Sequence, residues 1–288
     1  MHNKTYPGWL FFFRVNMAGF ALLHFLAIQP DFDMLYSFRG YIYPDIMDTA
    51  TDHFSPTLIT LQHYVGIQYE TLLWICRIAY PLALVSLILG FCTRVSAVLS
   101  LFLQLLLLKS IHLYEYGVDG YTTFALFYCC IFPVGYIYSV DNRLRKFIIA
   151  PVHEHWLILL KAHLCIAYFF SGFDKVIGVT WRNGEALWKT LHSHNYYSLF
   201  SLDFLVNTPF FLIAGWGTII LEMGYCIGMN VRVTRMWWLG AIVCLHLFIA
   251  LFMGLFFFSA MMILLNLCAY YTPYIDPERV RKRVQQQP

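Results

Sequence analysis

The chain has 288 residues, of which 60% are hydrophobic, 19% aromatic and only 12% charged. A soluble domain of ordinary composition carries about 25% charged residues, so charge here is too scarce to cover a surface in water. Disordered chains lack aromatic and β-branched residues, which excludes that class as well. The mean hydropathy of +0.62 and a length that holds about eight spans of about 20 residues predict an all-α, polytopic integral membrane protein.

Eight apolar runs divide the sequence and predict a helical bundle. In chain order they are Trp9–Ile28, Thr71–Phe91, Val95–Leu108, Tyr121–Tyr138, Trp156–Phe173, Pro209–Asn230, Met236–Met253 and Leu255–Tyr271. The last two runs are separated only near Gly254, so this stretch forms either two short helices or one bent helix. Residues 1–275 are expected to form one transmembrane domain, followed by a basic tail at 276–288.

Basic residues in the connections predict the orientation of the bundle, because cytoplasmic loops are enriched in Lys and Arg. Of the 19 basic residues, 11 fall on the side shared by both termini, 5 on the other side and 3 inside the spans. Both termini are therefore predicted to be cytoplasmic, and the lipid bilayer is the first expected partner. A net charge of +3 without a basic stripe outside the last residues gives no support for nucleic acid as a partner.

Two long connections, 29–70 and 174–207, fall on the predicted extracytoplasmic side. The first carries five aspartates, and the second is rich in Trp, His, Tyr and charge. Long loops over a rigid frame usually carry function, so chemistry is expected on this side. His192 and His194 lack a third ligand in the pattern, so no metal site is predicted.

A few polar side chains interrupt the apolar runs, although a charge at membrane depth costs at least about 2.5–3.5 kcal/mol. They are Arg14, Asn16, His24, Arg77, Lys161, His163, Glu222 and His246. Their spread over five spans suggests one polar cavity enclosed by the bundle. The alternative is a set of structural ion pairs, such as Glu222 with Arg14 or Arg77. For His246, a functional role and a packing role both stay open.

Lys175 lies at the extracytoplasmic end of the span that begins near Trp156. If the helix continues that far, Tyr168, Ser171 and Lys175 lie on one face, at positions i, i+3 and i+7. A partly desolvated lysine there would release its proton more readily and act as a base. The alternative is an interfacial lysine that pairs with Asp174.

An ordered set of short motifs resembles the HTTM family, the membrane-domain family of the vitamin K-dependent gamma-glutamyl carboxylases. The family's core motif is matched by Tyr-Phe-Phe-Ser-Gly-Phe-Asp-Lys at 168–175, followed by Trp181 and by Gly-Glu-Ala-Leu at 184–187. Further segments agree in the same order: Phe13-Arg14, residues 90–96, residues 138–141 and His246. The resemblance spans roughly Trp9 to Pro273.

The resemblance implies an enzyme that uses a reduced, vitamin K-like quinone as its cofactor. In the carboxylases, a lysine after the aromatic, small and glycine residues acts as the base for reduced vitamin K. Oxygenation then generates a strong base, which removes a proton from a glutamate γ-carbon, and the carbanion captures carbon dioxide. Lys175 falls on that position and is expected to be catalytic. His246 is expected to be catalytic too, stabilising the anion with Arg14. The expected ring site is lined by Tyr168, Ser171, Trp181 and Trp188.

The sequence also departs from the carboxylase pattern. Where the carboxylases carry a catalytic histidine, the in-register position falls nearer Asp119 than His112, and Asp174 replaces a family lysine beside the base. The alternative function is therefore a non-enzymatic membrane scaffold, or a maturation or export factor. It would bind an exported peptide or a partner protein through the outer connections. Short bacterial family members act in peptide maturation, which implies a bacterial inner (cell) membrane as the location.

Overall fold

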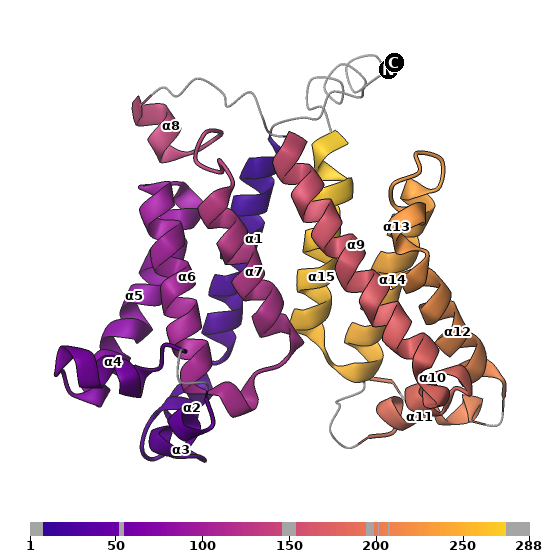
Figure 1. The fold of residues 1–288 in the computed structure, drawn as a ribbon, viewed down its shortest axis with the longest axis horizontal. Helices are drawn as coiled ribbons and strands as arrows, with labels where there is room; N and C mark the ends of the chain where they lie inside the picture. Colours follow the sequence, from indigo (N-terminus) through magenta and orange to yellow (C-terminus); the bar gives the residue numbers. More distant parts are fainter. Residues whose placement is uncertain are drawn as a thin grey trace. The chain divides into compact units, whose positions relative to one another are not determined.

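The computed structural model is built of helices alone, within the residues that it describes (Figure 1). These are residues 8–51, 55–145, 154–193, 199–200, 202–206 and 208–274. The chain divides into two compact units, named here the N-terminal unit (Pro7–Pro151) and the C-terminal unit (Met1–Tyr6 with Val152–Pro288). The all-α fold class is confirmed. The single domain at 1–275 stays a prediction, and the basic tail at 276–288 lies outside the described residues.

Four long helices form the N-terminal unit, and each packs against two of the others. They are α1 (Trp9–Ala27), α5 (Tyr69–Leu89), α6 (Thr93–Ser110) and α7 (Gly117–Ile131). Shorter elements lie in the connections: η1 (Gln29–Asp31), α2 (Phe32–Tyr36), α3 (Pro44–Thr49), α4 (Leu58–Val65), η2 (His112–Tyr114) and α8 (Val140–Arg145). The first long connection is thus largely helical where the structure describes it.

The end of α7 corrects one predicted run. The helix stops at Ile131, whereas the apolar run Tyr121–Tyr138 predicted that it continues to residue 138. Pro133 has no backbone N–H, and it restricts the residue before it to extended conformations. Phe132 accordingly has φ −71° and ψ 150°. The chain then runs without regular helix to residue 139, so its carbonyls need hydrogen-bond donors from elsewhere.

Arg14 of α1 supplies these donors. Its side chain is fully buried, and its guanidinium donates to the carbonyls of Val134 at 2.6 Å and Tyr138 at 2.7 Å, with a longer bond to Ile137 at 3.4 Å. Gly90, which ends α5, gives the guanidinium room: it has φ +70°, and a Cβ there would lie 2.9 Å from Arg14 Cζ. One arginine therefore ties α1 to the segment that follows α7.

Asp141 makes the next connection in the same region. Its carboxylate accepts hydrogen bonds from the backbone N–H groups of Cys92 at 2.9 Å and Thr93 at 2.7 Å, and from the Thr93 hydroxyl at 2.7 Å. These N–H groups stand at the start of α6, where a carboxylate is favoured by both hydrogen bonding and the helix dipole. Asp141 thereby fixes α6 against the segment after α7.

The C-terminal unit is built around two helix pairs, α9 (Glu154–Ile177) with α12 (Phe210–Met223) and α14 (Arg235–Met253) with α15 (Phe256–Tyr270). Contacts of α15 with α9 and of α12 with α14 join the pairs. The short elements are α10 (Val179–Arg182), α11 (Glu185–Leu191), η3 (Asp203–Leu205), α13 (Tyr225–Gly228) and η4 (Thr272–Tyr274). α10 and α11 pack at one end of the α9–α12 pair.

Two glycines break the predicted apolar runs of this unit. The run Pro209–Asn230 divides at Gly224 into α12 and α13, and a Cβ at Gly224 would lie 2.6 Å from the Trp238 ring. Gly254 has φ +67° and ends α14, which resolves the alternative left open by the sequence. The chain forms two separate helices, α14 and α15, that pack against each other.

Six helices among the described residues are long and apolar enough to cross a membrane. They are α1, α5, α6, α9, α14 and the stretch from α15 to Tyr274. The other two predicted spans are shorter helices, 15 residues in α7 and 14 in α12, against the roughly 20 that a full crossing needs. Multiple long apolar helices are consistent with a multi-pass integral membrane protein. The count of eight spans and the cytoplasmic termini stay predictions.

Arg14→Leu is expected to lower the free energy of unfolding by about 2–4 kcal/mol, because one buried and two partly buried backbone carbonyls lose their donor. Unfolding of the detergent-solubilised protein, followed by tryptophan fluorescence, measures the change. Arg94→Leu is the matched control: Arg94 is exposed and makes one long bond of 3.4 Å to the Ile131 carbonyl. It should stay within about 0.5 kcal/mol of wild type. Equal losses in the two variants would contradict the structural role of Arg14.

Candidate functional site

The candidate site begins on one face of α9, near its end. The helix continues to Ile177, so Tyr168, Ser171 and Lys175 share a face as predicted. The Lys175 amine donates to the Ser171 hydroxyl at 2.7 Å and to the Ser171 carbonyl at 3.3 Å. A short side chain at Ser171 lets the lysine lie along the helix and reach toward α12.

Lys175 forms an ion pair with Glu222 of α12, with 2.7 Å between Nζ and Oε2. Both side chains are largely withdrawn from solvent, at 16% and 9% exposed. The alternatives suggested by the sequence, Lys175 with Asp174 and Glu222 with Arg14 or Arg77, are therefore not the pairing found. Arg77 lies in the N-terminal unit and pairs with Asp33 at 3.3 Å.

Gly172 explains why α9 and α12 come close enough for this pair. A Cβ at Gly172 would lie 2.9 Å from the backbone nitrogen of Met223 and 3.1 Å from Glu222 Cβ. Any side chain there would force the two helices apart. The Ser-Gly sequence at 171–172 thus supports the ion pair in two ways. The Ser171 hydroxyl accepts a hydrogen bond from the lysine amine, and Gly172 lets α9 and α12 approach closely.

Trp181 of α10 completes the surroundings of the lysine. The centre of its ring lies 5.1 Å from Lys175 Nζ, within the range of a cation–π contact. The amine thus faces a carboxylate, a hydroxyl, a carbonyl and an indole ring. The structure therefore brings together the predicted residues Lys175, Ser171 and Trp181.

A second polar network joins Tyr168 to His246. The Tyr168 hydroxyl lies 2.7 Å from His246 Nε2, and the Asn266 amide donates to the same hydroxyl at 2.9 Å. Tyr225 donates to the Asn266 oxygen at 2.6 Å, and its ring stacks on Tyr168 with 4.1 Å between centroids. The other nitrogen of His246, Nδ1, is buried and has no hydrogen-bond partner among the described residues.

The network and the ion pair are neighbours. The charge of Lys175 acts electrostatically on the His246 ring, and Tyr168 and Lys175 lie on the same face of α9. His246 therefore has one nitrogen held in place by Tyr168, while the other is buried without a hydrogen-bond partner among the described residues.

The remaining predicted residues make other contacts. Arg14 belongs to the N-terminal unit, where its guanidinium donates hydrogen bonds to the backbone carbonyls that follow α7. Trp188 of α11 stacks on His192, with 4.9 Å between ring centroids. The polar side chains of the spans are thus distributed over both units, and a single cavity that encloses them stays a prediction. His194 lies outside the described residues.

Tyr225 and Asn266 were not identified from the sequence. Neutral polar side chains in apolar runs are common, and Tyr225 looks like a packing residue. Asn266 could have been identified from the sequence, because it is the one amide side chain in the apolar run 255–271. Buried amides need hydrogen-bond partners, so Asn266 belonged beside Asn16 among the polar residues that interrupt the apolar runs.

A comparison with family models gives one match, described as the HTTM domain, over residues 5–273. No curated protein and no solved structure matches the chain. The matched range takes in nearly all the described residues of both units, including the Lys175–Glu222 pair.

Lys175→Met is expected to lower the free energy of unfolding by about 3–5 kcal/mol, because Glu222 is left as a buried charge without a partner. Lys175→Met combined with Glu222→Leu should recover most of that loss. A double-mutant cycle by denaturant unfolding in detergent measures the coupling.

The exposed pair Lys189–Glu185 of α11 is the matched control, since its ion pair is also 2.7 Å but its side chains are 61% and 43% exposed. Its coupling energy should be about 0.3–0.5 kcal/mol. A similar small coupling for Lys175 and Glu222 would show that the buried pair has no special energetic role.

Proposed function

The chain belongs to the HTTM family, and on that premise we propose that it is a quinol-linked, carboxylase-like membrane enzyme in which Lys175 and Glu222 act together in proton transfer. The proposal rests on the contact of 2.7 Å between the lysine amine and the glutamate carboxylate in a largely buried site. Buried ion pairs are costly to form, so a pair close to a histidine with an unsatisfied ring nitrogen is a candidate for chemistry.

A protonated lysine cannot act as a base. In the proposal, Glu222 accepts the proton of Lys175 and so leaves the amine free to act as one. Transfer of one proton along the hydrogen bond from Nζ to Oε2 converts the ion pair into a neutral amine and a neutral acid. A bound ligand would complete the desolvation of the two charges and would therefore favour this exchange. The neutral Lys175 amine is then the base, and Glu222 holds the proton that the amine has released.

A reduced, vitamin K-like quinone is the cofactor that the family resemblance implies, and it would supply an ionisable hydroxyl and two electrons. The residues fit such a group. His246 Nδ1 is a buried polar atom without a partner among the described residues, which a ligand oxygen would satisfy. Trp181 lies beside the Lys175 amine and offers a ring for stacking. Tyr168 orients the imidazole through its bond to Nε2.

Each residue then has one task in the proposal. Lys175 Nζ accepts a proton from an acidic hydroxyl, and Ser171 holds the amine in place through its hydroxyl. His246 Nδ1 binds the developing anion or its hydroxyl. The resulting ammonium next to a neutral Glu222 would stabilise a bound anion electrostatically.

A second candidate function is a membrane scaffold or maturation factor for an exported peptide or partner protein. It is favoured by large apolar side chains that are exposed in the connections, among them Tyr41, Tyr64 and Phe204. Such side chains suit contact with another protein or with the membrane interface. A partner protein that copurifies in stoichiometric amount, without any bound quinone, would select this function.

The enzyme proposal is tested with the full chain in nanodiscs, by extraction of bound quinone and by aerobic consumption of added reduced vitamin K. Lys175→Gln combined with Glu222→Gln should slow consumption by about 10²–10⁴-fold, the usual contribution of a positioned base. Lys189→Gln combined with Glu185→Gln removes an exposed pair of the same kind and should leave the rate unchanged. Equal rates in both double variants would refute the role of the buried pair.

A further inference from the structure

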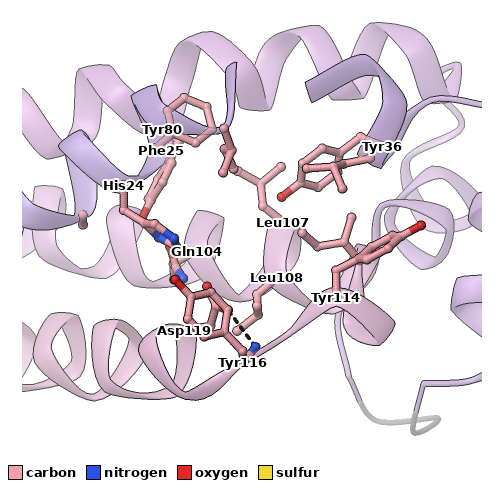
Figure 2. A pocket seen from close by; sticks show the side chains of 14 residues that line it. His24, Phe25, Tyr36, Tyr80, Gln104, Leu107, Leu108, Tyr114, Tyr116 and Asp119 are labelled. Carbon is pink, nitrogen blue, oxygen red and sulfur yellow. Dashed lines mark hydrogen bonds between the residues drawn. The ribbon is translucent and has the colours of Figure 1, made fainter. Parts of the chain in front are cut away.

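The N-terminal unit contains a cavity that the proposed function does not use (Figure 2). Its volume is about 230 Å³, and side chains from α1, α2, α5, α6 and α7 line it. That space corresponds to about eight water molecules, at about 30 Å³ each in the liquid. It therefore suits a small organic molecule or the head of a larger one.

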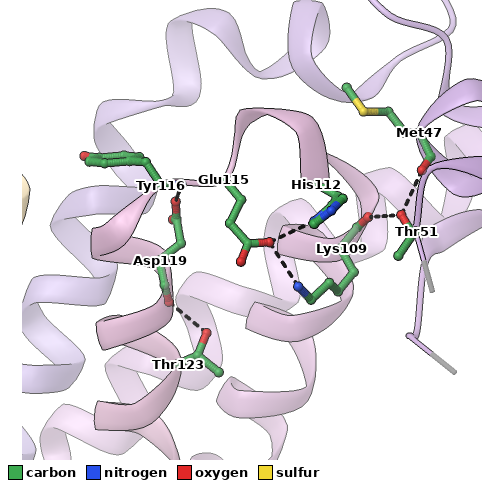
Figure 3. A network of polar contacts seen from close by, with 8 residues as sticks. All are labelled: Met47, Thr51, Lys109, His112, Glu115, Tyr116, Asp119 and Thr123. Carbon is green, nitrogen blue, oxygen red and sulfur yellow. Dashed lines mark hydrogen bonds and ion pairs between the residues drawn. The ribbon is translucent and has the colours of Figure 1, made fainter. Parts of the chain in front are cut away.

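The cavity wall contains a carboxylate, that of Asp119, which can accept further hydrogen bonds. Asp119 is 8% exposed, and its Oδ2 accepts the backbone N–H of Tyr116 at 3.0 Å (Figure 3). Its Oδ1 receives no hydrogen bond from any other side chain that the structure describes. A carboxylate has about four acceptor sites, and Asp119 lines the cavity, so this carboxylate is a natural contact for a ligand that donates a hydrogen bond.

Two more polar groups in the wall have unused capacity. The Tyr36 side chain is 3% exposed, and its hydroxyl bonds to none of the described residues; Figure 2 shows the ring at the edge of the cavity. Gln104 accepts a hydrogen bond from Tyr80, while its amide nitrogen has no acceptor within the described part of the chain. Besides the carboxylate of Asp119, the cavity therefore offers Tyr36 and Gln104 as neutral polar groups with unused hydrogen-bonding capacity.

The imidazole of His24 is the basic group among the lining residues of the cavity (Figure 2). Neither Lys nor Arg is among the lining residues. Lys109, the nearby cation, is already paired with Glu115 at 3.0 Å, and His112 binds the same carboxylate at 3.1 Å (Figure 3). Burial alone would raise the pKa of the Glu115 carboxyl, but hydrogen bonds and charge from Lys109 and His112 hold that pKa below its usual value. Lys109 is thus committed to Glu115.

Aromatic rings supply most of the remaining wall. Phe25, Tyr36, Tyr80, Tyr114 and Tyr116 line the cavity, and Phe25 meets Tyr80 edge to face with 5.0 Å between centroids. Ring faces attract cations, and several rings around one anion form the arrangement that recognises organic ammonium groups.

We propose that this cavity binds a small organic ammonium group, with the nitrogen at Asp119 and the attached carbons among the rings. The carboxylate provides the charge, the rings stabilise the cation, and Tyr36 and Gln104 add polar contacts. Both a free amine and the amine headgroup of a lipid carry this chemistry.

The direct test measures binding to the detergent-purified full chain by titration calorimetry. Phenethylamine, which is an ammonium ion at neutral pH, is compared with phenethyl alcohol, its neutral counterpart of similar shape. The ammonium ion should bind at least about tenfold more tightly, the usual advantage of a charge-assisted hydrogen bond. Equal affinities, or no binding of phenethylamine, would overturn the proposal without any need for a variant.

Asp119→Asn should remove the preference, lowering the affinity for phenethylamine by about tenfold or more. The asparagine oxygen can still accept the Tyr116 N–H, so the start of α7 is preserved. Asp31→Asn is the matched control, because it removes an exposed carboxylate that is outside the lining and forms no ion pair with any described residue. Its affinity should stay within about twofold of wild type, since surface charges are screened. An unchanged preference in Asp119→Asn would also overturn the proposal.

A third arm separates the two sources of the ammonium group. The protein is placed in nanodiscs of phosphatidylethanolamine or of phosphatidylglycerol, and phenethylamine binding is measured in each. Weaker binding only in phosphatidylethanolamine indicates that a lipid headgroup competes for the cavity. Equal binding in both supports a free amine as the occupant.

Discussion

Polar groups inside apolar helices must find their partners within the chain, because a hydrocarbon environment offers none. Both units are organised by this constraint. In the N-terminal unit, Arg14 supplies donors to the carbonyls exposed when Pro133 ends α7. In the C-terminal unit, Lys175 and Glu222 satisfy each other across α9 and α12. The two sites differ in one respect: the Arg14 guanidinium donates to backbone carbonyls, whereas the Lys175 amine pairs with a carboxylate, with which we propose that it exchanges a proton.

This difference separates the motifs that carry the family resemblance into two groups. The segments at 13–14, 90–96 and 138–141 converge on the hydrogen bonds of Arg14 and Asp141, so their task is to hold α1, α6 and the segment after α7 together. The segment at 168–175 places Lys175 against Glu222, and its glycine permits the close helix contact. Arg14 is thus better explained by folding than by binding a cofactor.

Much of the architecture was predictable from the sequence, because apolar runs are local signals, although the breaks at Pro133 and Gly224 were missed. All eight runs contain helices, and the shared face of Tyr168, Ser171 and Lys175 followed from helical spacing. The partner of Lys175 was not predictable. Adjacent residues such as Asp174 and Lys175 do not share a helix face, and pairing with Glu222 depends on how closely α9 and α12 pack. The Asp119 cavity likewise combines residues from five helices.

Infrared difference spectroscopy tests the central claim, that Lys175 and Glu222 share protons as one unit. Reduced vitamin K is added to the protein in nanodiscs, and the carbonyl band of protonated carboxylic acids is recorded. If Lys175 takes a proton while Glu222 holds another, a carboxylic-acid band should grow in the wild type and be missing in Glu222→Gln. The same band in both proteins, or no change in either, would contradict the account.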